Sequence, residues 1–330
     1  MKKKVGFLFI TFIRTSFINK ILKKLYSKNY DLIIYQNLPE PSKPNSTKQS
    51  ERILRKFLEG KKNVSYIRPK KHLSAGDSIE YAITYGTQYY DYLLIVEDDI
   101  TLLDNAEYFI KNTIKELSKN QKIASISLYS PFINLPKVLN YDKQKFTYLN
   151  SNFAHSWGWI LKTKYWQNFD SKKFLEKELK ILSYKGLYEK LLFKTIFGLA
   201  KLSSLGIIKT WDYQWNMYCW VNNYSHLLLI PSLSKDNGNK DKKATNSLNS
   251  STADPIDLRN ENIKNFNFLD KKNSNIITLK NIDYLYLTKH HNLGFNRILI
   301  INLLANINPK IANFIFKNLR KTRSFLNKFK

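Results

Sequence analysis

Residues 92–100 read Tyr-Leu-Leu-Ile-Val-Glu-Asp-Asp-Ile, an apolar run that ends on three consecutive acids. Five apolar residues in a row are typical of a strand buried on both faces, as in a mainly parallel α/β sheet. Such sheets bind their ligands at the carboxyl ends of the strands. Glu97, Asp98 and Asp99 are therefore expected at a ligand site, where carboxylates suit a hard divalent cation that also binds phosphate. The alternative explanation is a solvated acidic turn before a helix.

The surrounding sequence alternates between predicted strands and predicted helices. The strands are expected at 5–11, 31–35, 64–67, 92–97 and 123–128, and the helices at 16–28, 49–58, 74–85, 106–119, 172–205 and 210–221. This alternation predicts a doubly wound α/β fold, a mostly parallel sheet flanked by helices. The polar stretch 234–262 is expected to be a long loop.

Composition limits the class of protein. The 330 residues, 43% of them hydrophobic, are enough for one large α/β domain and an appendage. The net charge of +28 indicates an anionic partner, whether nucleic acid, acidic phospholipid or a phosphorylated substrate. Cys219 is the single cysteine, which excludes an intramolecular disulfide and a zinc site built on several thiolates.

The amino-terminal segment imitates part of a signal peptide. Lysines at 2–4 precede a short apolar run at 5–13, but Arg14 follows at once, and we expect a first strand there, with an uncleaved signal as the alternative. No apolar run approaches the roughly 20 residues that a membrane-spanning helix needs. The sequence therefore predicts a cytoplasmic protein that is soluble or peripheral on the inner face of the membrane.

Four short blocks occur in an order that resembles the GT-A fold nucleotide-sugar glycosyltransferases. The blocks cover 11–15, 97–99, 156–159 and 211–215, and the last is followed by Asn237 and Gly238. The resemblance is greatest to the N-acetylglucosaminyltransferases that initiate complex N-glycans (glycosyltransferase family 13-like) and to bacterial family 2-like transferases. It covers about three quarters of the chain, and four ordered blocks are more specific than any one motif.

The resemblance implies a role for each block. Asp99 would be the metal ligand, for Mn²⁺ first and Mg²⁺ second, and Asp212 the catalytic base. The donor-binding residues would be Thr11, Arg14, Asn37, Gly76, Glu97 and Asp98. Two departures weaken the match at the nucleotide base, because Ile13 replaces the usual asparagine and Asn37 lies where an acidic residue is expected.

The residue chemistry independently supports these roles. A diphosphate leaving group gathers negative charge, which a divalent ion stabilises. An inverting transferase also needs a base beside the acceptor hydroxyl. Asp212 lies between Trp211 and Tyr213, where burial would raise its pKa toward the useful range. The alternative role for Asp212 is to cap the helix that runs to residue 221.

The aromatic blocks predict the acceptor side of the site. Trp157, Trp159 and Trp211 could stack on sugar rings, and Gly158 would let the backbone approach a ligand closely. Core packing is the alternative for each tryptophan, because aromatic residues more often fill cores.

The resemblance also divides the chain. Residues 1–247 would form the GT-A domain, with a nucleotide-sugar half at 1–130 and an acceptor half at 131–247. Residues 248–330 would form a linker and a basic extension. Within it, apolar residues at helical spacing in 296–330, with lysine and arginine around them, are typical of a helix on an anionic membrane. The alternative is a helix packed on the domain.

The expected function is metal-dependent, inverting sugar transfer in surface polysaccharide or lipooligosaccharide biosynthesis. The donor would be a nucleotide-sugar, with UDP favoured, and the acceptor a glycan or a lipid-linked molecule. A basic nucleic-acid-binding protein is the alternative, but the acidic triplet would repel phosphate without a metal, so no nucleic acid is expected. A nucleotidyltransferase is a third possibility. It lacks support, because this sequence has no glycine-rich, basic phosphate-binding loop near the first strand.

Overall fold

The computed structural model describes only part of the chain. The described residues are 3–103, 106–133, 147–171, 187–208, 210–230, 232–237, 256–257, 276–278, 283, 300–301, 304, 307–308, 310–311, 314–315 and 318. The predictions for Gly238, for 172–186 and for most of 248–330 lie outside these residues.

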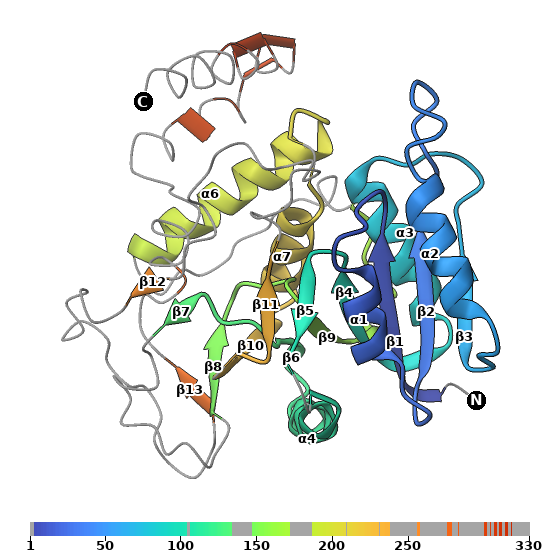
Figure 1. The fold of residues 1–330 in the computed structure, drawn as a ribbon. Coiled ribbons are helices and arrows are strands. Elements are labelled where there is room, and N and C mark those ends of the chain that lie inside the picture. Colours follow the sequence, from blue (N-terminus) through green and yellow to red (C-terminus); the bar gives the residue numbers. More distant parts are fainter. Residues whose placement is uncertain are drawn as a thin grey trace.

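A nine-stranded sheet forms the centre of the structure (Figure 1). In spatial order its strands are β13 (Ile276–Thr278), β8 (Thr147–Ser151), β10 (Ser225–Ile230), β6 (Ile123–Ser127), β9 (Trp159–Lys162), β4 (Tyr90–Glu97), β1 (Lys3–Thr11), β2 (Asp31–Gln36) and β3 (Val64–Ile67). Strand β9 is antiparallel to both neighbours, β4 and β6, and β8 is antiparallel to β10. All other neighbours pair in parallel, which confirms the predicted mostly parallel sheet.

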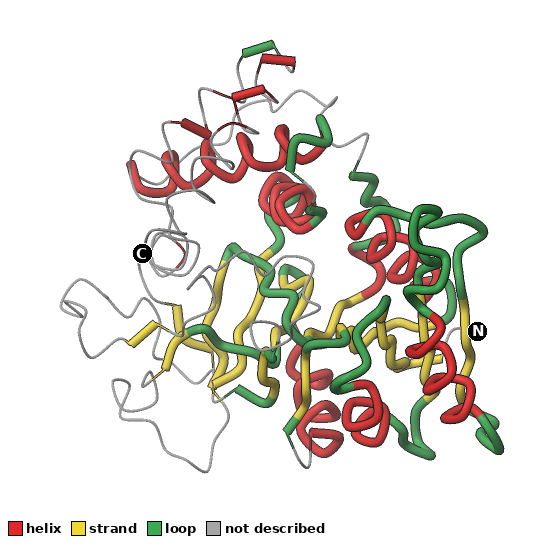
Figure 2. Tube along the Cα trace, turned by 45° about the horizontal axis from the view of Figure 1, so that its top comes forward, coloured by secondary structure: helices red, strands yellow, loops and turns green. Residues whose placement is uncertain are grey.

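Helices cover both faces of this sheet (Figure 2). They are α1 (Ile18–Leu25), α2 (Lys48–Leu58), α3 (Ala75–Thr87), α4 (Ala106–Lys119), α6 (Leu187–Ser204) and α7 (Asp212–Val221), with a short 3₁₀ helix, η1 (Thr163–Tyr165). In Figure 1, α4 lies below the strands and α6 and α7 lie above them. None of the described helices is long and apolar enough to cross a bilayer.

The alternation of side chains along the central strands creates two cores. Phe7 on β1 and Leu94 and Val96 on β4 pack with α1, α2 and α4 on one face. Leu93 and Ile95 pack with α3, η1 and α7 on the other. Each fully buried leucine or isoleucine stabilises the fold by about 1.5–3 kcal/mol. Burial on both faces explains why these strands read as continuous apolar runs.

Two small sheets lie beside the large one. Strand β11 (Ser234–Asp236) is antiparallel to β5 (Ile100–Leu102), and β12 (Ile256–Asp257) is parallel to β7 (Phe132–Ile133). Asp283 accepts a hydrogen bond from Ser151 Oγ at 2.5 Å, and β13 pairs with β8. Pieces of the chain beyond residue 247 thus complete the sheet, while the predicted division into a domain and an extension stays a prediction.

Candidate active site

The acidic triplet lies at the carboxyl edge of the parallel strands. Strand β4 ends at Glu97, and β5 begins at Ile100. Because side chains alternate along a strand, Glu97 shares the face of Leu93 and Ile95, which pack with α3 and α7. Glu97 is therefore directed to the side of the sheet where α7 begins, at Asp212.

Asp98 joins the end of β4 to the end of β1. Its Oδ2 accepts hydrogen bonds from Thr11 Oγ1 at 3.0 Å and from the Phe12 backbone N–H at 3.1 Å, and its Oδ1 accepts one from Arg14 at 2.8 Å. Burial raises the pKa of Asp98, although Arg14 and these hydrogen bonds act in the opposite direction. The structure thus brings Thr11 and Arg14, both predicted to bind the donor, into contact with the triplet.

Arg14 bridges two of the three acids. Its Nη1 donates to Asp98 Oδ1 at 2.8 Å and to Asp99 Oδ2 at 2.5 Å. Burial lowers the pKa of Arg14, but the charges on Asp98 and Asp99 outweigh it and raise the pKa overall. The guanidinium therefore stays charged and balances one of the two negative charges that it contacts.

Glu97 lacks a comparable partner. Its carboxylate accepts no hydrogen bond from any residue that the structure describes. Burial first, and then the charges on Asp99 and Asp98, raise the pKa of Glu97 well above its usual range, although Arg14 opposes the shift. The charge on Asp212 adds to it. Since charges interact only over a limited distance, this places the end of β4 and the start of α7 in one site.

We expect Glu97→Gln to stabilise the protein, because it removes a buried carboxylate that other carboxylates repel. At pH 8 the melting temperature should rise by about 1–2 °C, which corresponds to about 1 kcal/mol at this chain length. The folded-state pKa is raised, so the penalty is present above that pKa and vanishes below the unfolded value of about 4.3. Thermal unfolding from pH 8 to pH 4 should therefore show the two proteins converging.

The matched control is Glu116→Gln on α4, where the acid pairs with Lys119 at the surface. An exposed pair of this kind contributes about 0–1 kcal/mol, so its loss should not stabilise the protein. A Glu97→Gln variant that melts below the wild type at pH 8 would contradict the charge repulsion described above.

Asp212 is the first residue of α7. Its Oδ1 accepts a hydrogen bond from Thr210 Oγ1, and its backbone carbonyl accepts one from Asn216 Nδ2 at 2.7 Å. Burial raises the pKa of Asp212, and the Thr210 hydrogen bond lowers it. The N-cap of α7 is Trp211, so the capping role that the sequence offered for Asp212 is not observed, although Asp212 does begin the helix.

Gly76 lies in the first turn of α3, against the segment before α7. A Cβ at this position would be 3.5 Å from the Thr210 carbonyl oxygen and 3.6 Å from Trp211 Cβ. Ser74 caps this helix, since its Oγ accepts a hydrogen bond from the Asp77 N–H at 3.3 Å. The positive end of the α3 dipole thus faces the same region as Asp212, where an anionic ligand would be favoured.

Asn37 is buried just after β2, and its amide is committed to the protein. Its Nδ2 donates to the Leu73 carbonyl at 2.8 Å, and its Oδ1 accepts from the Leu38 N–H at 2.9 Å and from the Leu73 N–H at 3.2 Å. These bonds hold the start of the α3 loop beside β2. The structure explains a positioning role for Asn37, and donor contact by its side chain stays a prediction.

The three tryptophans of the predicted acceptor side differ in exposure. Trp159 and Trp211 stack on each other with ring centroids 5.9 Å apart, and they are 1% and 6% exposed. Trp157 is only partly buried, and its ring lies edge-on to Tyr129 at 5.2 Å. Core packing, the alternative in the sequence, describes Trp159 and Trp211, and sugar stacking by any of the three stays a prediction.

Gly158, between Trp157 and Trp159, lies in close contact with strands β5 and β11. Its φ is +75°, in the region that favours glycine. A Cβ there would lie 3.1 Å from Ile100 Cγ2 and 3.1 Å from Ser234 Cβ. Atoms of β5 and β11 therefore fill the space beside Gly158, where the sequence suggested the close approach of a ligand.

We expect Gly158→Ala to destabilise the protein more than Gly60→Ala, which is the matched control. Gly60 has a similar φ of +71°, but apart from its two chain neighbours no atom of the described residues lies within 4 Å of the place that a Cβ would take. Both variants carry the cost of a positive φ, about 1–2 kcal/mol, and only Gly158→Ala adds overpacking of about 1–3 kcal/mol. Urea unfolding measures the difference. Equal losses in the two variants would show that Ile100 and Ser234 move aside freely.

Asn237 is a site residue whose contacts the sequence did not reveal. Its backbone N–H and its Nδ2 both donate to the Asp99 carbonyl, at 2.8 and 3.0 Å, and the Nδ2 also reaches Thr101 Oγ1 at 3.0 Å. Asn237 thus holds the end of β11 over the acidic triplet. The similarity of Asn237 and Gly238 to a family block placed this segment in the catalytic region without identifying the contact.

The site residues fit a divalent ion that a substrate helps to hold. In the described part of the chain, no group of three or more His, Cys, Asp or Glu side chains is arranged to hold a metal. Mg²⁺ and similar ions are commonly bound by one or two carboxylates together with substrate phosphates. Asp99 offers such a ligand, because its Oδ1 accepts no hydrogen bond from the described residues while its Oδ2 contacts Arg14.

Comparison with known proteins finds similarity in structure only. No protein-family model matches the chain, and no curated protein matches its sequence. TarS from S. aureus is similar with a TM-score of 0.42 and 13% identity, covering 72% of this chain and 61% of that one. Mouse xyloside xylosyltransferase 1 has a TM-score of 0.29 and 10% identity, covering 48% of this chain and 68% of its own. HddC from Yersinia pseudotuberculosis has a TM-score of 0.30 and 10% identity, and the match covers 50% of this chain and 80% of the HddC chain.

The chain spans about three fifths of the TarS chain, 61% of its length. Because these TM-scores and identities are low, the fold assignment depends on the sheet itself. Parallel strands β3, β2, β1 and β4 are followed by the antiparallel β9 and then by β6, with the acidic triplet at the end of β4. The protein has a GT-A-like fold, as the sequence predicted. The closer likeness to family 13 is not confirmed.

Proposed function

We propose that the protein is a metal-dependent, inverting glycosyltransferase that uses a nucleotide-diphosphate sugar, with a UDP-sugar favoured. One observation supports this most. Glu97, Asp99 and Asp212 gather at the carboxyl edge of the sheet, in a chain of net charge +28, and Arg14 is the cation that pairs with the triplet among the described residues. Such an excess of carboxylates is suited to a divalent cation and a diphosphate.

The donor side of the proposed site uses the residues around β1 and β4. Asp99 would hold Mn²⁺ or Mg²⁺, which supplies charge stabilisation to the departing diphosphate when bound. Arg14 adds a fixed positive charge beside it, and Asp98 keeps Arg14 in place. Glu97 would contact the ribose or the sugar. Thr11, Asn37 and Gly76 would line the nucleotide side, in part by positioning backbone groups.

The acceptor side uses α7. Asp212 would take the proton from the acceptor hydroxyl as that oxygen attacks the anomeric carbon. Burial raises the pKa of Asp212, so its carboxylate is a stronger base than that of an exposed aspartate. Trp157, Gly158, Trp159 and Trp211 would shape the acceptor pocket, with Trp157 as the candidate for direct stacking because it is only partly buried.

The acceptor would be a glycan or a lipid-linked molecule in bacterial surface polysaccharide or lipooligosaccharide biosynthesis, reached from the cytoplasmic face of the membrane. The described part of 296–330 has features of both a packed helix and a membrane-binding one. Leu304 is buried against Leu202 and Ile207, as in a packed helix, while Ile311 and Phe314 are 54% and 67% exposed. We propose that the packed residues attach the segment and the exposed ones enter an anionic membrane surface.

A thermal-shift screen of nucleotide-sugars with and without Mn²⁺ tests the proposed function. At a donor concentration about 100 times its dissociation constant, the folded protein gains about 2.7 kcal/mol. We expect one nucleotide-sugar to raise the melting temperature, and Mn²⁺ to enlarge that rise. If no nucleotide-sugar shifts the protein with or without the metal, the proposal is wrong.

A further inference from the structure

A polar cavity lies at the start of β4, opposite the end of that strand that carries the carboxylates. Its volume is about 600 Å³, within the range of small-molecule sites. Asp91 and Tyr92, at the start of β4, line it, and Glu97 is at the other end of that strand. At about 3.3 Å per residue the two sites are roughly 20 Å apart, so the cavity is separate from the candidate active site.

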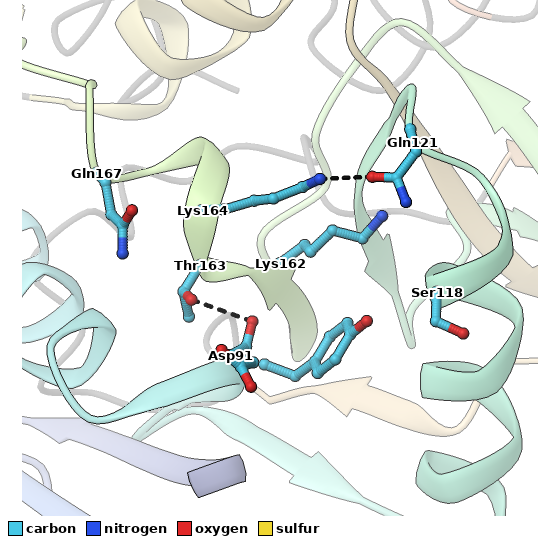
Figure 3. Close-up of a pocket in the computed structure, with 8 residues that line it drawn as sticks. Asp91, Ser118, Gln121, Lys162, Thr163, Lys164 and Gln167 are labelled. Atoms are coloured by element: carbon cyan, nitrogen blue, oxygen red, sulfur yellow. Dashed lines mark hydrogen bonds between the residues drawn. The ribbon is translucent and has the colours of Figure 1, made fainter. Parts of the chain in front are cut away.

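Two lysines enter this cavity from the end of β9 and from η1. Figure 3 shows Lys162 and Lys164 extending toward Gln121. Lys162 Nζ donates to the Asn120 carbonyl at 2.9 Å, and Lys164 Nζ donates to Gln121 Oε1 at 2.5 Å. Each ammonium has three N–H donors, so each keeps donors for a ligand.

The two positive charges are close together. Both ammonium groups lie over the ring of Tyr165, with Nζ at 5.4 Å from the ring centroid for Lys162 and 4.9 Å for Lys164. Neither forms an ion pair with a carboxylate of the described chain, including Asp91, the acidic residue of the lining. Two adjacent cations repel each other, and a bound anion would relieve that repulsion.

Lys162 is an unusual residue for its position. It is the last residue of β9, whose four residues are all buried, and it is only 5% exposed. Burial first and then the charge on Lys164 lower the pKa of Lys162 to about 8. An apolar side chain would fill this position without that cost, and a lysine that is kept buried beside a cavity is typical of a binding group.

We propose that this cavity binds a phosphate monoester of a small, hydroxyl-rich molecule. A phosphate monoester carries a charge of about −1.5 to −2 at pH 7, which matches the two lysines. The cavity is larger than a phosphate, and Ser118, Gln121 and Gln167 provide the hydroxyl and amide groups that would bind the rest of the ligand. The proposal does not depend on the proposed glycosyltransferase activity.

Inorganic phosphate is the probe that tests the core of this site. Calorimetry on the full chain, with chloride at equal ionic strength as the reference, should show saturable binding of one phosphate. Lys164→Met should weaken that binding at least tenfold. Lys164 is exposed, so its replacement leaves the fold intact, and Lys162→Met, which preserves most of the buried stem, should have at least the same effect.

Two controls make the result specific. Lys115→Met removes an exposed lysine of α4 outside the cavity and should keep wild-type phosphate affinity, which excludes a general effect of the net charge. Asp99→Asn alters the candidate active site and should also leave this binding unchanged. Phosphate binding that is absent, non-saturable or equal in Lys164→Met and Lys115→Met would overturn the proposal.

Discussion

Replacing Asp99 with asparagine is expected to lower metal-dependent sugar transfer by about 10³-fold, or about 4 kcal/mol in the barrier. The variant keeps the size of the side chain but removes the charge that would bind the cation. It also removes one of the two carboxylates that Arg14 contacts. Steady-state rates with saturating Mn²⁺ measure the loss, and excess metal should restore little of it.

Glu116→Gln on α4 is the control for the loss of a single acid, since Glu116 pairs with Lys119 and is not among the residues of the candidate site. It should transfer sugar at the wild-type rate. An Asp99→Asn enzyme with wild-type, metal-dependent activity would contradict the assignment of Asp99 as the metal ligand.

Asp212→Asn is expected to lower the rate of transfer by about 10²–10⁴-fold while leaving donor affinity nearly unchanged, because it removes a general base. Asparagine keeps an oxygen that can accept the Thr210 hydrogen bond, so the start of α7 should be preserved. Transfer rates and donor binding, measured on the same preparation, separate the two effects. A matching loss of donor affinity would assign Asp212 to the donor side instead.

The pH dependence gives a second test of the base. Asp212 must be ionised to accept a proton, so the rate should rise with pH as Asp212 loses its own proton and then level off. Burial raises the pKa of Asp212 and the Thr210 hydrogen bond lowers it. Thr210→Val should therefore move the acid limb of the profile to higher pH. An unchanged limb would indicate that another group controls it.

The central strands could be predicted from sequence because they are buried on both faces. Phe7, Leu94 and Val96 alternate with residues that pack on the opposite core, so no polar positions interrupt the runs. The helices α2, α4 and α7 were also predicted within a residue or two of their bounds. Local periodicity predicts where the strands and helices lie in the sequence. It does not predict the order or the direction of the strands in the sheet.

Strands β8, β9 and β10 were not predicted. Strand β9 has only four residues, lies within an aromatic block and inserts antiparallel between β4 and β6. A short, fully buried segment has no alternation that would distinguish it from a turn or a helix. The same burial places Trp159 in the core, where the sequence suggested a sugar contact.

The contacts of the candidate site are mostly between distant parts of the chain, which explains what the sequence could not reveal. Arg14 meets Asp98 and Asp99 across 84 and 85 residues, and Asn237 meets Asp99 across 138. Similarity of motifs predicted that these blocks belong to one site. It did not predict that Arg14 would neutralise part of the triplet or that Asn237 would hold β11 over it.

The most direct test of the proposed site is whether the protein binds Mn²⁺ together with a nucleoside diphosphate. Electron paramagnetic resonance reports free Mn²⁺, with Mn²⁺ plus UDP in the absence of protein as the reference. We expect the protein and UDP together to reduce the free signal well below that reference, and Asp99→Asn to return it there. A signal that stays at the reference with UDP and with every other nucleoside diphosphate would contradict the proposed site.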